Sequence, residues 1–289
     1  AKSFLKEDII PTAVYRPRYL LAPVISLSCA LILIAVVPFG SPEITGPGGF
    51  HFFQISDVNI GLLVVLGVTS LGVYGIALAG WSSNNKYSLL GSLRSSAQLI
   101  SYELALGLSL VGVVLHAQSL NLRVIVENQA AHGLLSWNFF GGLQFVAFFI
   151  YLMAAYAETN RAPFDLPEAE SELTAGYHTE YSSMKFAMFF MAEYANMINV
   201  GAVATLLFLG GWTSPFGNLF PEPHNIVLQA LLPIFWFVLK VFSFLFLYVW
   251  VRGTLPRFRY DQLMNFGWRY LMPIAILNIV ATSLWLVYK

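Results

Sequence analysis

The chain of 289 residues alternates between long apolar runs and shorter polar segments. A helix that crosses a bilayer needs about 20 mostly apolar residues. Backbone polar groups inside lipid must be paired within their own segment, so continuous runs of this length predict α-helices. We therefore predict an all-α polytopic membrane protein, folded as a single transmembrane domain over residues 1–289. The seven predicted spans cover residues 19–38, 60–80, 96–117, 138–157, 185–209, 229–250 and 270–288.

The composition agrees with lipid as the surrounding solvent. Hydrophobic residues make up 57% of the chain and charged residues only 10%, whereas soluble domains carry about 25% charged residues. The single cysteine, Cys29, cannot by itself build a disulfide framework, a zinc site or an iron–sulfur cluster. The sequence therefore predicts no metal site and no nucleic-acid partner, and any redox cofactor is expected in another chain.

Basic residues gather on one side of the predicted membrane domain. With seven spans, loops alternate between two sides, and 12 of the 15 Lys and Arg residues fall on the side of the N-terminal end. The opposite side has Arg123 and Lys289. Because Lys and Arg are enriched in cytoplasmic loops, we expect the first side to be cytoplasmic, in a bacterial inner membrane. The 12 residues are Lys2, Lys6, Arg16, Arg18, Lys86, Arg94, Arg161, Lys185, Arg252, Arg257, Arg259 and Arg269.

The loop at 158–184, on the predicted cytoplasmic side, concentrates acidic residues. Clustered carboxylates repel one another and burial raises their pKa, so such a cluster can hold and pass protons near neutral pH. A solvated acidic loop is the alternative, and composition alone does not separate the two. Six of the 15 acidic residues lie here: Glu158, Asp165, Glu168, Glu170, Glu172 and Glu180.

Part of this acidic cluster has a structural explanation. Asp165 and Glu168 have the spacing of a capping box, with Pro167 in the first turn of a short helix. Acidic groups near a helix N-terminus are stabilised by its dipole. The excess charge at Glu158, Glu170 and Glu172 is less well explained in this way.

Three ionisable residues, Glu103, Glu193 and Lys240, lie inside predicted spans. Each costs about 2.5–3.5 kcal/mol at the centre of a helix. The two glutamates lie roughly 10 and 12 Å along their helices at 1.5 Å per residue, so we expect all three groups at similar depth. Lys240 either forms a buried ion pair with one glutamate or belongs to a proton relay that continues inward from the loop. We favour the relay, because two acids share one lysine.

Arg252, Arg257 and Arg259 follow the sixth span. They predict either anchoring at lipid headgroups or docking to a partner, because Arg binds carboxylates bidentately. His178 has no second histidine at helical spacing, so we expect it to hydrogen-bond locally rather than bind a metal.

Several motifs resemble one known family. Residues 157–173 read AETNRAPFDLPEAESEL and residues 176–181 read GYHTEY. Together they are similar to the signature loop of the quinone-channel subunit of respiratory complex I, a family that includes mitochondrial subunit 1 of NADH dehydrogenase. Family members have eight spans, so we expect this chain to lack an N-terminal span. Further similar stretches are KEDIIP at 6–11, SNNKY at 83–87, LRSSAQ at 93–98, SYE at 101–103 and WVRGTLPRFRYD at 250–261.

The resemblance implies a membrane-arm subunit of a proton-pumping NADH:quinone oxidoreductase, with no redox centre of its own. The substrate is ubiquinone or menaquinone, and NADH, FMN and iron–sulfur clusters are held by partner subunits. The expected partners are redox-arm subunits with the terminal cluster, small membrane-arm subunits and the lipid bilayer. The implied proton pathway is Glu103, Glu158, Asp165, Glu168, Glu170, Glu172, Glu193 and Lys240. The implied quinone-tunnel or redox-arm docking residues are Arg161, Phe164, Arg252, Arg257 and Arg259.

Two other functions compete with this one. A membrane anchor of an energy-converting hydrogenase or formate-hydrogenlyase complex needs no quinone, but its acidic loops diverge from the residues at 160–172. A stand-alone transporter would also explain charges inside spans, but the chain shows no inverted repeat and no helices broken by Gly and Pro pairs. Subunits that co-purify with the chain distinguish the three.

Overall fold

The computed structural model describes residues 5–41, 53–130, 133–165, 176–216 and 226–288, and no strand occurs within these ranges. The longer helices are α2 (Arg16–Val36), α3 (Gly61–Ser82), α4 (Lys86–Ala117), α6 (Leu143–Glu158), α8 (Ser183–Phe208), α9 (Ile226–Thr254) and α11 (Met272–Tyr288). The shorter elements are α5 (Leu122–Ala130), α10 (Tyr260–Phe266), the 3-10 turns Gly133–Ser136, Asn138–Phe140 and Gly176–His178, and the π-helix Gly267–Leu271.

Six of the seven predicted spans coincide with helical segments that are long and apolar enough to cross a membrane. They are α2, α3, α4, α8, α9 and the continuous segment Tyr260–Tyr288. The seventh, predicted at 138–157, forms α6 with only 16 residues, about 24 Å at 1.5 Å per residue. Gly142 delays the start of this helix because its φ of +68° is left-handed. The helical polytopic fold is confirmed, and one span is shorter than predicted.

Helix α4 begins at Lys86 rather than at residue 96 as predicted. The Asn85 side chain caps it by accepting a hydrogen bond from the Tyr87 backbone N–H at 3.0 Å. The added first turns are serine-rich and pack closely on α3, where a Cβ on Gly80 would lie 2.6 Å from the Ser88 backbone oxygen. Small residues bring membrane helices together, whereas a hydropathy pattern counts serine as polar and so places the start of the span too late in the chain.

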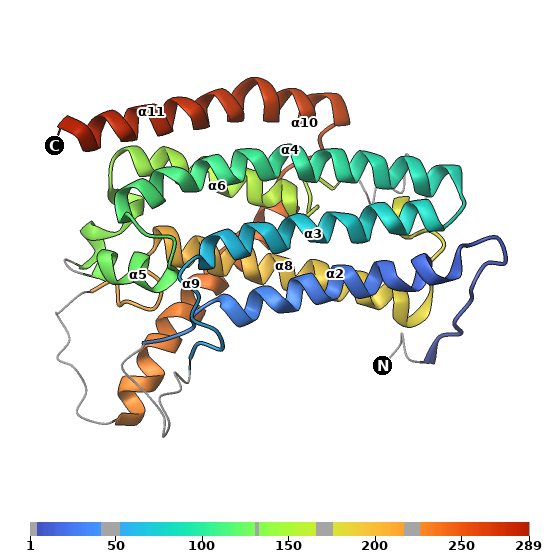
Figure 1. The fold of residues 1–289 in the computed structure, drawn as a ribbon, viewed down its shortest axis with the longest axis horizontal. Helices are drawn as coiled ribbons and strands as arrows, with labels where there is room; N and C mark the ends of the chain where they lie inside the picture. Colours follow the sequence, from blue (N-terminus) through green and yellow to red (C-terminus); the bar gives the residue numbers. More distant parts are fainter. Residues whose placement is uncertain (1–4, 42–52, 131–132, 166–175, 217–225, 289) are drawn as a thin grey trace.

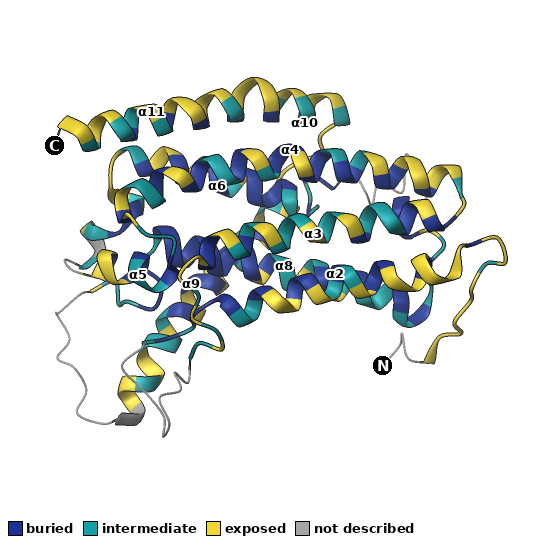
Figure 2. Ribbon diagram, in the orientation of Figure 1, coloured by how far each residue is buried: buried dark blue, intermediate teal, exposed yellow. Residues whose placement is uncertain are grey.

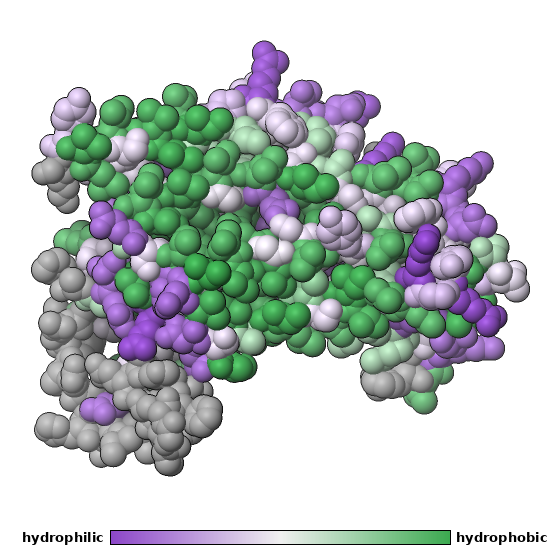
Figure 3. All heavy atoms as spheres, in the orientation of Figure 1, coloured by the Kyte–Doolittle hydropathy of each residue, from purple (hydrophilic) through white to green (hydrophobic). Residues whose placement is uncertain are grey.

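Figure 1 shows α2, α3, α4 and α8 running side by side, α9 crossing them at an angle and α11 lying along the outer side of α4. Inner helix faces are buried and outer faces exposed (Figure 2). Hydrophobic atoms cover the middle of the face in Figure 3, with hydrophilic atoms gathered towards its ends. Polar side chains tie the helices together: Asn199 Nδ2 donates to the Ala30 oxygen at 2.8 Å, and the Tyr151 hydroxyl donates to the Val200 oxygen at 2.9 Å. These features fit a bundle surrounded by lipid.

Contacts between loops show which segments meet at one end of this bundle. The Asn85 side chain, before α4, donates to Glu180 at 2.8 Å. At the N-terminal end, Asp8 pairs with Lys185 at 2.8 Å. Arg257, between α9 and α10, pairs with Asp165 at 3.0 Å. The four segments that are predicted from their basic residues to share one side of the membrane therefore lie together around the described parts of the acidic loop.

Candidate functional site

Three carboxylates line one internal cavity of about 70 Å³. Glu103 comes from α4, Glu158 from the C-terminal end of α6 and Glu193 from α8. Further walls come from α2 and α3, so the cavity lies inside the bundle. Since a water molecule needs about 10–15 Å³ of such space and two to four polar partners, the cavity has room for several.

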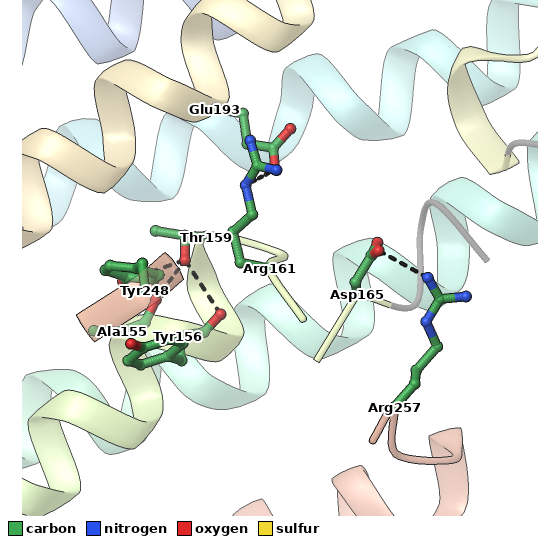
Figure 4. Close-up of polar contacts among 8 residues, drawn as sticks. All are labelled: Ala155, Tyr156, Thr159, Arg161, Asp165, Glu193, Tyr248 and Arg257. Carbon is green, nitrogen blue, oxygen red and sulfur yellow. Dashed lines mark hydrogen bonds and ion pairs between the residues drawn. The ribbon is translucent and has the colours of Figure 1, made fainter. Parts of the chain in front are cut away.

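Glu193 forms an ion pair with Arg161, with Oε1 and Nε 2.7 Å apart (Figure 4). The two side chains are only 13% and 9% exposed, so the pair lies largely outside water. The Arg161 guanidinium also lies over the Tyr194 ring, 4.5 Å from its centroid. Arg161 thus stabilises the charged form of an acid inside the bundle.

The other two glutamates have no such cation among the described residues. The Ser70 hydroxyl of α3 donates to Glu103 Oε1. Glu158 Oε2 is buried and has no hydrogen-bond partner within the described parts of the chain. A second cavity of about 20 Å³ also borders Glu158 and shares Thr69 and Asn199 with the first. A small, mostly apolar cavity therefore continues past Glu158 along the inside of the bundle.

The C-terminal end of α6 is held in place by its neighbours. The Thr159 hydroxyl bonds with the Ala155 and Tyr156 oxygens at 3.1 and 3.2 Å and with the Tyr248 hydroxyl of α9 at 3.3 Å (Figure 4). The Tyr156 and Tyr248 rings stack with their centroids 4.0 Å apart. These contacts fix the direction in which Glu158 enters the cavity.

The start of the acidic loop is equally fixed. The Gln98 side chain of α4 is fully buried and donates to the backbone oxygens of Ala157 and Phe164, at 2.8 and 3.0 Å. Between these two anchors the chain turns so that Arg161 reaches Glu193. A polar residue in the predicted helix is therefore what positions the loop arginine.

The structure excludes the ion pair that was one alternative for Lys240, and it corrects the depth that was expected for this residue. Lys240 pairs with neither glutamate: its Nζ donates to the backbone oxygens of Leu209, Gly211 and Thr213 at 2.7, 2.8 and 2.8 Å, and lies 4.2 Å from the Trp137 ring centroid. Nor is it at the depth of Glu193, because Leu209 lies sixteen residues further along α8, roughly 24 Å at 1.5 Å per residue. Backbone carbonyl groups that follow the end of a helix are free to accept hydrogen bonds from a lysine. The sequence pattern did not show that α8 ends beside Lys240.

Asp165 has a partner that the sequence did not predict. Its carboxylate pairs with Arg257, whose side chain is 41% exposed (Figure 4). Next to it, Phe164 is buried and stacks on Phe258 at 5.6 Å between ring centroids. The other acidic residues of the predicted cap and cluster, Glu168, Glu170 and Glu172, lie outside the described residues.

The remaining predicted arginines, Arg252 and Arg259, are exposed at the same end of the bundle. The backbone N–H of Arg259 donates to Gln262 Oε1 at 3.3 Å, which helps to begin α10. Both side chains are therefore placed for contact with lipid or with a partner.

The cavity of the three glutamates is also lined by uncharged polar residues that the sequence analysis did not identify. Thr69 in α3 and Asn196 and Asn199 in α8 line it beside the glutamates. Asn196 lies three positions after Glu193, on the same helix face. The spacing of these polar residues inside an apolar run was the sequence signal that could have identified them as cavity residues.

Within the described part of the chain, the side chain of His178 makes ring contacts rather than the local hydrogen bond that the sequence predicts. The contacts of its buried ring are edge-on packing against Tyr177, Phe186 and Phe190, at 5.0 to 6.0 Å between centroids. Burial among these rings lowers the pKa of His178 from 6.5 to about 4.

His178 should make this end of the bundle sensitive to acid. Its pKa is lower in the folded state, so its contribution to stability is intact above pH 6.5 and is lost as the pH falls towards 4. The full loss is about 3 kcal/mol at 1.36 kcal/mol per pKa unit. We expect the protection factors of the amides in segment 176–182, which correct for the pH dependence of intrinsic exchange, to be lower at pH 5 than at pH 7.5, and His178→Phe to reduce that difference. The exposed His116→Gln is the control, and equal acid sensitivity in His178→Phe would contradict the assignment.

Comparison with known proteins identifies the family. Residues 1–283 match the family model described as NADH dehydrogenase. The chain belongs to the NADH dehydrogenase family. It is 60% identical to H subunit 2 of the NADH-quinone oxidoreductase of Koribacter versatilis, over 100% of this chain and 82% of the relative. It is 49% identical to H subunit 1 of the same enzyme from Solibacter usitatus (98% and 82%) and 51% identical to the H subunit from Protochlamydia amoebophila (98% and 80%). The resemblance read from the acidic loop is thereby confirmed, and the long apolar helices make the chain a multi-pass membrane protein.

Proposed function

We propose that this chain is the quinone-channel subunit of a proton-translocating NADH-quinone oxidoreductase, where it provides quinone access and begins the proton path. The names of its relatives support the assignment to this enzyme complex. The observation that carries the proton path is the cavity shared by Glu103, Glu158 and Glu193. It joins three carboxylates from three helices inside a bundle that is otherwise largely apolar.

The three carboxylates differ in the neighbouring groups that balance their charge. Because of this difference, a proton can be transferred from one carboxylate to another. Arg161 favours the ionised form of Glu193, and Ser70 donates to Glu103. The buried Oε2 of Glu158 has no donor among the described residues, so nothing among them balances a charge on this oxygen. Glu158 is therefore the group that takes up a proton, and water in the cavity passes it to the other acids.

In this proposal, quinone is reduced and the redox-arm subunits dock at the end of the bundle where the acidic loop lies. Arg252 and Arg259 are exposed there, and Arg257 is half-exposed beside Asp165. We assign this end to the cytoplasmic side, where redox-arm subunits would dock, because 12 of the 15 basic residues lie on that side. Arg161 and Phe164 link it to the interior: Arg161 reaches the Glu193 cavity and Phe164 is buried beneath Phe258. Glu168, Glu170 and Glu172 belong to the proposed proton path on the ground of the sequence alone. Lys240 has a different role in this proposal and holds the far end of α8.

Glu158→Gln tests the proton path. It keeps the size of the side chain but cannot take up a proton, so we expect a loss of proton pumping of about a hundredfold or more in the assembled complex, the scale of a lost proton-transfer group. Proton uptake by membrane vesicles, driven by NADH and quinone, measures this. Glu127→Gln is the matched control, because Glu127 is a half-exposed surface acid paired with Arg123. Full pumping by an assembled Glu158→Gln complex would contradict the proposal.

A further inference from the structure

A third cavity, of about 750 Å³, lies between α6, α9 and α10, away from the three glutamates. Its walls are mainly apolar, from residues such as Leu152, Leu247 and Phe266. This volume is in the range of pockets that hold a small molecule. The three lining helices belong to the membrane domain, so the cavity is open to an apolar ligand from the bilayer.

One rim of this cavity is polar. Gln262, Asn265 and Arg269 line it at spacings of three and four residues along Tyr260–Tyr288, so they follow one helix face. Arg269 forms no ion pair within the described part of the chain, although it borders an apolar cavity. A guanidinium at such a rim is suited to a phosphate, which it can bind with two parallel hydrogen bonds.

The polar rim is held rigidly. The Tyr102 hydroxyl of α4 donates to the Leu263 oxygen at 2.9 Å, and Trp268 Nε1 donates to Ser101 Oγ at 3.2 Å. The second anchor, Trp268, belongs to the π-helix Gly267–Leu271, which also contains Arg269. Such insertions re-aim side chains and are frequent at functional sites. Trp268 and Tyr270 beside it are exposed aromatics of the kind that lie at a membrane interface.

We propose that this cavity binds an anionic phospholipid, with an acyl chain between α6, α9 and α10 and its phosphate on Arg269. The charge of the rim selects this occupant. Arg269 lies on the side that carries most of the basic residues, and the cytoplasmic leaflet holds the anionic lipids. A neutral isoprenoid chain would fill the apolar part but leave Arg269 without a counter-ion. The bound lipid bridges α6 and α10. It thereby joins the helix that carries Glu158 to the helix that begins directly after Arg259.

The test uses the purified, delipidated complex in neutral detergent, with labelled phosphatidylglycerol as the probe. We expect saturable binding that Arg269→Gln weakens about fivefold, since one basic group near the lipid surface contributes about 1 kcal/mol. Leu247→Trp, which fills the cavity, should weaken it too. Arg16→Gln is the control, because Arg16 is an exposed arginine at the start of α2. Subunit composition on native gels confirms that each variant has assembled.

Several results would overturn this assignment. Equal binding by both variants and the unmodified complex would show that the cavity holds no phospholipid. Equal binding of phosphatidylcholine would remove the role of charge, and full competition by glycerol phosphate would remove that of the acyl chain. Complete displacement by ubiquinone would assign the cavity to quinone. Binding is measured without turnover, so its failure is distinct from a failure of proton pumping.

Discussion

Replacing Arg161 by glutamine should destabilise the subunit by about 3–5 kcal/mol, the usual loss when one partner of a buried ion pair is removed. Glu193 would then be left inside the bundle without its counter-charge, and the ring contact of Arg161 with Tyr194 would go with it. The thermal unfolding midpoint of the purified complex and the amount of assembled subunit measure the loss.

The double variant Arg161→Gln with Glu193→Gln separates the ion pair from other effects. It removes both charges, so we expect it to recover much of the stability, and the difference gives the coupling between the two side chains. Arg123→Gln is the matched control: Arg123 pairs with Glu127 at a similar distance, 2.8 Å, but the two side chains are 29% and 48% exposed, against 9% and 13% in the buried pair. Such a surface pair contributes about 0.3–0.5 kcal/mol. If the double variant is no more stable than Arg161→Gln, the pair is not what holds Arg161 in place.

Lys240→Met should cost about 3 kcal/mol, because it leaves three buried backbone oxygens without their donor. All three hydrogen bonds of Nζ go to the chain just after α8, at Leu209, Gly211 and Thr213. The cation also packs on Trp137. We therefore expect less assembled complex and a lower unfolding midpoint, with the number of protons pumped per quinone unchanged in the fraction that assembles.

Lys86→Met controls for loss of a lysine. Lys86 also lies over an aromatic ring, that of Tyr87 at 5.2 Å, but it is exposed, so we expect a change below about 0.5 kcal/mol. A normal amount of stable complex with fewer protons pumped in Lys240→Met would return Lys240 to the proton path predicted from sequence.

The sequence alone predicted which segments are helical and that they cross a membrane. This succeeded because the signal is local: about 20 apolar residues in a row have one stable structure in lipid. The predicted ends of the helices were wrong where small or polar residues form the contacts between helices. The serines at the start of α4 pack against Gly80, and Gly142 shortens α6, and neither effect is visible in average hydropathy.

The ionisable residues of the site could also be chosen from sequence, because charges inside apolar runs are rare and expensive. Glu103 and Glu193 were identified in this way, and Glu158 by its place in the acidic loop. The family followed from the residues of that loop, and the similarity to known proteins confirmed it.

The partners of these charges were decided only by the tertiary structure. The sequence suggested an ion pair of Lys240 with a glutamate as one alternative. In the structure Glu193 pairs with Arg161, and Lys240 donates hydrogen bonds to three backbone carbonyl groups. The reason is that an ion pair depends on where a loop turns and where a neighbouring helix ends, and both were set by distant contacts such as Gln98 with Phe164. The sequence by itself determined the helices, their membrane setting and the charges they carry. The packing of those helices decided which charges meet, because that depends on distances between residues far apart in the chain.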